Sequence, residues 1–168
     1  DLNLFHESWH TILIRRKSQE DKNLREAVFG KGTKIAPIFC HYYPHRIFLE
    51  ALPAEAKEKE LVFSILSPDN IMPLIRYNSK DQGQTIFYNQ LKEILIKQGY
   101  ENLIPELRLP LVAVSGRKDK YLEVAGKRIY PEEIKQGLYE DFEVAAKTTG
   151  YFRLSKDEKG PRIEIQLK

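Results

Sequence analysis

The sequence has very little cysteine and methionine, and it has no long apolar run. Among its 168 residues, Cys40 is the single cysteine and Met72 the single methionine. One thiol cannot form an internal disulfide, which is typical of a reducing compartment, and we expect a cytoplasmic protein. No apolar run approaches the ~20 residues that a membrane-spanning helix needs, so we expect no membrane span. Because the chain opens at Asp1 and its only methionine is Met72, we expect a fragment or a processed chain, and no signal peptide opens the sequence.

A strong charge of one sign is also missing. The chain carries 27 Lys and Arg residues against 24 Asp and Glu residues, a net charge of +3. An excess this small lacks the basic surface typical of nucleic-acid binding, so we expect no nucleic-acid partner. Hydrophobic residues make up 42% of the chain, which is enough to bury a core and excludes wholesale disorder.

The spacing of apolar residues predicts a mixture of strands and helices. We expect strands over residues 2–5, 11–14, 47–50, 60–66, 109–114, 144–154 and 162–168, and helices over 21–29 and 85–98. Residues 121–130 predict a β-hairpin that turns at Gly126, and Pro131 is suited to open the helix that follows it. The fold class is therefore α+β, and the tail after Gly116 is expected to run ββαββ.

Three separate segments, in their order along the chain, resemble motifs of the adenylate-forming ligases of the acyl-CoA synthetase superfamily. They are MPLIRYNSKD at residues 72–81, LPLVAVSGRKDK at 109–120 and VAGKRIYPEEI at 124–134. The runs YPHRIFLE at 43–50 and ELVF at 60–63 look like the phenylacetate-CoA ligase branch. Each segment is weakly specific alone, but together and in this order they identify the chain as similar to the C-terminal part of such a ligase.

The resemblance implies a role for four residues. Asp81 corresponds to the aspartate that holds the ribose hydroxyls of ATP, because a carboxylate can accept from both. Arg117 corresponds to an arginine beside the ribose and phosphate, where its fixed positive charge suits adenylate. Asp119 corresponds to the hinge of the mobile lid. Gly126 lies where the hairpin borders the pantetheine tunnel, and its lack of a side chain leaves room for the thiol arm of CoA.

The implied reaction activates a small carboxylic acid with ATP and Mg²⁺ and then transfers the acyl group to CoA. Residues 1–116 would be the β-rich end of a large N-terminal domain, and residues 117–168 would be the lid domain. The upstream part of the large domain would be missing, and with it the glycine-rich ATP loop and the acyl pocket. The fragment alone is therefore expected to be inactive.

Two departures from the family pattern leave other interpretations open. Lys80 replaces a glycine of the family, and a lysine adopts a positive φ less readily. Lys120 replaces the second aspartate that follows the Gly-Arg pair. A non-catalytic relative that keeps the fold for binding is one alternative.

The other alternative is a zinc hydrolase, because the five residues from His6 to His10 match the pattern H-E-x-x-H. That chemistry needs both histidines on one helical face. The β-branched run at 11–14 favours a strand instead, so we assign no metal ligand here. A second pair, His41 and His45, has Pro44 between them, which argues against a helix.

Overall fold

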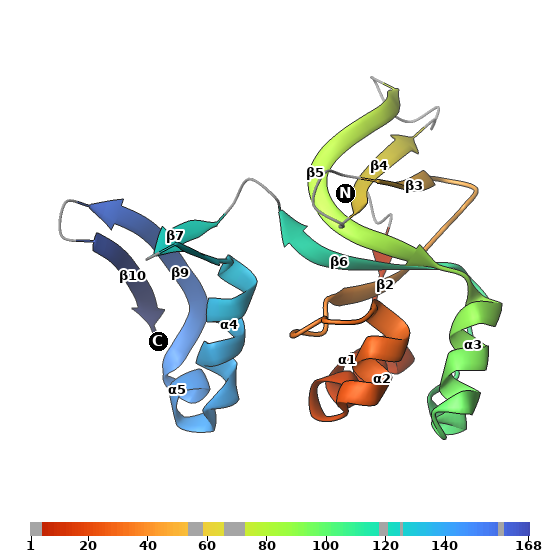
Figure 1. The fold of residues 1–168 in the computed structure, drawn as a ribbon, viewed down its shortest axis with the longest axis horizontal. Coiled ribbons are helices and arrows are strands. Elements are labelled where there is room, and N and C mark those ends of the chain that lie inside the picture. The colour runs from red at the N-terminus through yellow and green to blue at the C-terminus, as the bar shows by residue number, and fades with distance from the viewer. Residues whose placement is uncertain (1–4, 54–58, 66–72, 118–120, 125, 158–159) are drawn as a thin grey trace. The chain divides into compact units, whose positions relative to one another are not determined.

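The computed structural model describes residues 5–53, 59–65, 73–117, 121–124, 126–157 and 160–168 (Figure 1). Helices make up 32% and strands 44% of the structure, which confirms the predicted mixed α+β class. The chain divides into two compact units, unit 1 (Asp1–Ser115) and unit 2 (Gly116–Lys168). No helix in the described part of the chain combines the length and the apolar character needed to cross a membrane.

Within the described residues, unit 1 is organised around a six-stranded sheet in the order β1-β2-β6-β5-β4-β3. The strands are β1 (Phe5–His6), β2 (Ile38–Tyr42), β3 (Phe48–Pro53), β4 (Lys59–Ile65), β5 (Leu74–Ile86) and β6 (Leu111–Arg117). The expected strands at 47–50 and 60–66 are confirmed as β3 and β4, which pair antiparallel from Phe48 opposite Ser64 to Pro53 opposite Lys59. The expected strand at 109–114 is confirmed as β6, although it begins two residues later.

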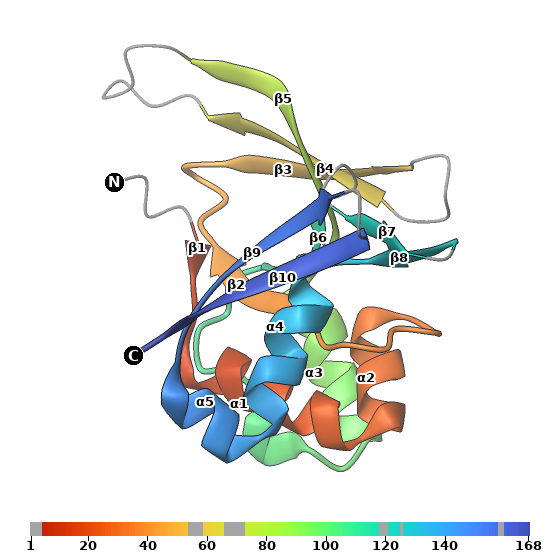
Figure 2. The same cartoon turned by 90° about the vertical axis from the view of Figure 1, so that its left-hand side faces the viewer.

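Three helices cover one face of this sheet (Figures 1 and 2). They are α1 (Trp9–Glu20), α2 (Lys22–Phe29) and α3 (Tyr88–Lys97), and a short 3-10 turn, η1 (Glu101–Leu103), follows α3. The helices predicted at 21–29 and 85–98 are confirmed as α2 and α3. The second begins later than predicted because β5 continues to Ile86.

Strand alternation divides the buried residues of unit 1 between the two faces of the sheet. Phe39 and Leu111 point to the helix face, where they pack with fully buried residues such as Leu24, Leu91 and Leu95. Their neighbours Cys40 and Val112 belong to a second cluster on the other side, with Ile47, Leu49, Leu61 and Ile65. Both faces of the central strands are therefore buried.

Residues 11–14 are helical, so the predicted strand is wrong. Ser8 is the N-cap of α1: its hydroxyl accepts from the Thr11 backbone N–H at 3.2 Å, and the Thr11 hydroxyl accepts from the Ser8 N–H at 3.0 Å. This reciprocal pair satisfies two N–H groups at the helix start. Thr11, Ile14 and Ser18 then form the buried stripe of the helix. The cap and this three-to-four-residue spacing outweigh the β-branched character of the run.

Unit 2 contains one short hairpin, one longer hairpin and two helices. Its elements are β7 (Leu122–Val124), β8 (Lys127–Ile129), α4 (Pro131–Glu140), α5 (Phe142–Lys147), β9 (Thr148–Asp157) and β10 (Gly160–Leu167). The hairpin around Gly126, the helix opened by Pro131 and the last strand are confirmed. In β9 and β10, Leu154 pairs with Ile163 and Phe152 pairs with Ile165.

The expected strand at 144–154 is wrong over its first four residues, which belong to α5. Asp141 is the N-cap of this helix, because its carboxylate accepts from the backbone N–H groups of Glu143 and Val144 at 2.8 and 3.2 Å. The order of unit 2 is therefore ββααββ, with one helix more than we expected. Both helices of the unit pack on β9 (Figure 1).

Candidate functional site

Asp81 lies at the end of a bulge in β5. Across the β4–β5 pair, Val62 is opposite Asn78 and Glu60 is opposite Gln82, so residues 79–81 together face a single residue of β4. Such a bulge bends a strand and redirects its side chains, and bulges are frequent beside functional sites. The half-buried carboxyl group of Asp81 is positioned by this bulge.

Side chains within the bulge hold its backbone. The Asn78 side-chain oxygen accepts from the Lys80 N–H at 2.8 Å, and the Ser79 hydroxyl donates to the Leu61 carbonyl at 3.4 Å. The Asp81 N–H in turn donates to the Ser79 hydroxyl at 3.4 Å. Asn78 and Ser79, which are common turn residues, are thus the supports of the bulge.

Lys80 adopts the left-handed conformation that we expected a lysine to resist. Its φ is 64°, and Arg76 in the same strand has a φ of 48°. A non-glycine residue in this region costs about 1–2 kcal/mol. The expectation from the glycine-to-lysine change is therefore wrong: the backbone takes the conformation that glycine favours, at an energetic cost.

β5 runs unusually close to β6 two residues after Asp81. A Cβ atom added to Gly83 would collide with the backbone carbonyl of Ala113 and would lie 2.9 Å from the Leu61 side chain. Glycine is the residue that allows such an approach. The bulge is therefore followed by a tightly packed contact with the apolar part of β6.

The other three predicted site residues lie at the end of β6 or after it along the chain. Arg117 is the last residue of β6 and is half-buried, and Gly116 before it has a φ of 131°, which other residues adopt rarely. Asp119 lies outside the described residues. Gly126 occupies the turn between β7 and β8 with a φ of 75°, and no atom lies within 4 Å of the position that a Cβ would take. Asp81 thus belongs to unit 1, and Arg117 and Gly126 belong to unit 2.

The two histidines of the H-E-x-x-H match lie on different elements. His6 is in β1, where it pairs with His41, and His10 is in the first turn of α1. Ser8 between them is the N-cap, so the helical face that the zinc-protease pattern requires does not form. Within the ranges that the structure describes, no group of three or more His, Cys, Asp or Glu side chains is arranged to hold a metal ion.

His41 is a buried polar residue whose partner the sequence analysis did not identify. Its side chain is fully buried in β2, and its Nε2 atom lies 3.2 Å from the Ser8 hydroxyl. Burial lowers the pKa of His41, and the nearby His6 and His10 lower it further, while the Leu109 backbone acts in the opposite direction. A neutral His41 therefore links β2 to the start of α1. The spacing of Ser8 and Thr11 signals the start of a helix, whereas no local pattern in the sequence indicates that His41 contacts it.

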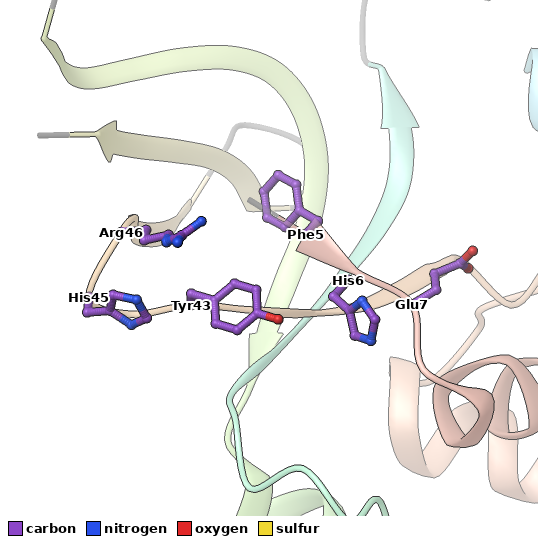
Figure 3. A pocket seen from close by; sticks show the side chains of 6 residues that line it. All are labelled: Phe5, His6, Glu7, Tyr43, His45 and Arg46. Atoms are coloured by element: carbon purple, nitrogen blue, oxygen red, sulfur yellow. The ribbon is translucent and has the colours of Figure 1, made fainter. Parts of the chain in front are cut away.

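Two hollows open on the surface of unit 1. The first, of about 550 Å³, is mostly apolar and includes the exposed rings of Phe48 and Phe87 beside Arg108. The second, of about 470 Å³, lies between β1 and the turn after β2 (Figure 3). Sequence analysis predicted neither, because each joins residues that are distant along the chain.

Comparison of the chain with protein-family models gives no match, and comparison with curated protein sequences gives none either. A functional assignment therefore depends on the three ligase-like sequence segments, on their order along the chain and on their local geometry.

Proposed function

We propose that the chain is the C-terminal part of an adenylate-forming ligase similar to the phenylacetate-CoA ligases. Such an enzyme activates a small carboxylic acid with ATP and transfers the acyl group to CoA in the cytoplasm. The observation that carries the proposal is the bulge at residues 79–81, in which Lys80 takes the positive φ of the glycine in the family pattern. This geometry supports nucleotide binding at the bulge despite the glycine-to-lysine change.

In this proposal the bulge presents the Asp81 carboxylate to the two ribose hydroxyls of ATP. The resemblance also implies that Arg117 offers its fixed positive charge to adenylate. Most of the rate enhancement in such a reaction comes from positioning and from electrostatic stabilisation of the phosphates. Magnesium would enter with the phosphates of ATP, as it commonly does in enzymes that bind this nucleotide.

The division of the chain supports a two-domain arrangement for this enzyme. Unit 1 ends at Ser115, and Gly116 at the junction has a φ of 131°. In the proposal, residues 117–168 are the lid, which rotates about Asp119 between the adenylation and thioester-forming steps. Gly126 would then leave space for the pantetheine arm of CoA.

A matched pair of variants tests the nucleotide site in a protein that includes the upstream part of the large domain. Asp81→Ala should nearly abolish acyl-adenylate formation, measured by pyrophosphate exchange. Lys80→Gly should retain exchange and stabilise the fold by about 1 kcal/mol, because glycine has no steric penalty at this φ. A folded Asp81→Ala protein that exchanges pyrophosphate at the wild-type rate would exclude Asp81 from the site.

The hinge is tested by Asp119→Pro in the same protein. Proline fixes φ and should hold the lid in one pose, so one half-reaction should be lost far more than the other. Pyrophosphate exchange measures the first half-reaction, and acyl transfer to CoA from supplied acyl-adenylate measures the second. Equal loss of both, or of neither, would show that residue 119 is not the pivot.

A further inference from the structure

The hollow between β1 and the turn after β2 is built on a tight chain reversal. The Arg46 and Ile47 backbone N–H groups both donate to the Tyr43 carbonyl, at 2.9 and 3.1 Å. This turn places the side chains of Tyr43, His45 and Arg46 at one wall of the hollow (Figure 3). Because these hydrogen bonds hold the backbone of the turn, they also fix the backbone positions from which the three side chains extend.

Ring contacts order the same three side chains. The Tyr43 and His45 rings meet edge to face, with centroids 5.8 Å apart. The guanidinium carbon of Arg46 lies 5.9 Å from the centre of the Tyr43 ring, within the range of a cation–π contact. Among the residues that the structure describes, no carboxylate forms an ion pair with Arg46, and its side chain is exposed. Its positive charge is therefore available to a ligand.

The opposite wall comes from β1, whose place is set by its pairing with β2. Phe5 pairs with Tyr42 and His6 pairs with His41. The Phe5 ring is 43% exposed and adds a second apolar surface beside Tyr43 (Figure 3). The remaining lining residue, Glu7, is engaged by Arg15 at 3.0 Å, so the charge of its carboxylate is already partly neutralised. The hollow thus combines two aromatic rings with an uncompensated arginine.

We propose that this hollow binds a small organic phosphate that carries a planar ring. The phosphate would accept hydrogen bonds from the Arg46 guanidinium, whose fork of donors matches phosphate oxygens. His6 and the Tyr43 hydroxyl add donors at the same hollow. The ring of the ligand would pack against Phe5 and Tyr43. The site shares no lining residue with the bulge at residues 79–81, so it is independent of the proposed ligase function.

Phenyl phosphate and inorganic phosphate are the probes for this site, titrated separately into the 168-residue chain by isothermal titration calorimetry. We expect saturable binding of phenyl phosphate with a dissociation constant on the order of 1 mM. Inorganic phosphate should bind more weakly, because it lacks the ring. Failure of phenyl phosphate to bind, or equal affinity for both probes, overturns the proposal.

Matched variants locate the binding. Arg46→Gln should weaken phenyl phosphate binding about tenfold or more, since it removes charge-assisted hydrogen bonds. Arg16→Gln removes the same charge from an exposed position of α1 and should leave the affinity unchanged. Glu7→Gln should strengthen binding, because it removes the single negative charge among the lining residues.

Asp81→Ala separates this site from the proposed nucleotide site and should not change phenyl phosphate binding. Circular dichroism of each variant confirms that it is folded before titration. Equal effects of Arg46→Gln and Arg16→Gln, or loss of binding in Asp81→Ala, place the phosphate elsewhere and overturn the assignment.

Discussion

Unit 1 and unit 2 differ in how far they bury their apolar residues. Unit 1 has buried clusters on both faces of its sheet. In unit 2, Leu138 is the one buried hydrophobic side chain among those described, while Ile163 and Leu167 of β10 are 48% and 68% exposed. Two-stranded sheets are marginally stable by themselves, and small units bury a small fraction of their surface.

This difference predicts unequal local stability. Segments with few buried contacts open at a lower free energy than the central strands and helices of a core. Amide hydrogen exchange should therefore be slower in α3 and β6 than in α4 and β10. Substitutions of the same type in the two units test this difference in stability.

The largest effect is expected from leucine-to-alanine changes. Leu91 in α3 is fully buried, and Leu91→Ala should lower the free energy of unfolding by about 2–5 kcal/mol. Leu138 in α4 is 9% exposed and belongs to a smaller core, so Leu138→Ala should cost less. Urea unfolding of both variants measures the two losses. A greater loss of unfolding free energy for Leu138→Ala than for Leu91→Ala would contradict the prediction that unit 1 has the more stable core.

The next largest effect is expected from glycine-to-alanine changes, which should alter stability in opposite directions in the two units. Gly83→Ala should destabilise unit 1 by about 1–3 kcal/mol, because the new methyl group meets the Ala113 carbonyl. Gly137 lies inside α4 with open space around it, and Gly137→Ala should stabilise that helix by about 0.5–1 kcal/mol. Thermal unfolding and amide exchange distinguish the two changes. A stabilising Gly83→Ala would contradict the close approach of β5 and β6.

A smaller effect is expected from the protonation of Asp21 in unit 1. The hydrogen bonds that its carboxylate accepts from the Leu24 N–H and the Tyr100 hydroxyl lower the pKa of Asp21 below its usual 3.8. A carboxyl group with a lowered pKa stabilises the folded state above pH 3.8, and this contribution is lost as the pH falls through the folded-state pKa. The unfolding temperature of the wild type should therefore fall more than that of Asp21→Asn between pH 5 and pH 2.

Cys40 is a natural probe for the opening of unit 1, so no additional cysteine has to be introduced. Burial raises the pKa of its thiol to about 11, so at pH 8 very little reactive thiolate is present. Modification by an aromatic disulfide reagent should therefore need opening of the unit 1 core. Leu91→Ala should accelerate the reaction, and Leu138→Ala should not. Equal acceleration by both would show that the two units open together.

Several local features of the fold could be predicted from the sequence because neighbouring residues determine them. Glycine at the turn set the β7–β8 hairpin, and Pro131 set the start of α4. The alternation of apolar residues set β10. Two short segments were mispredicted because their helix caps were overlooked: Ser8 caps α1 and Asp141 caps α5, and each accepts backbone hydrogen bonds at the start of its helix.

The fold class, most of the elements and the order of the ligase-like segments follow from the sequence alone, since these depend on composition and short-range spacing. The left-handed backbone of Lys80 depends instead on tertiary structure, because the pairing of β4 and β5 imposes the bulge. The tertiary structure also brought Phe5 to the hollow that Arg46 lines, since a hollow between a strand and a distant turn exists only after β1 has paired with β2. Long-range pairing has no local signal in a single chain.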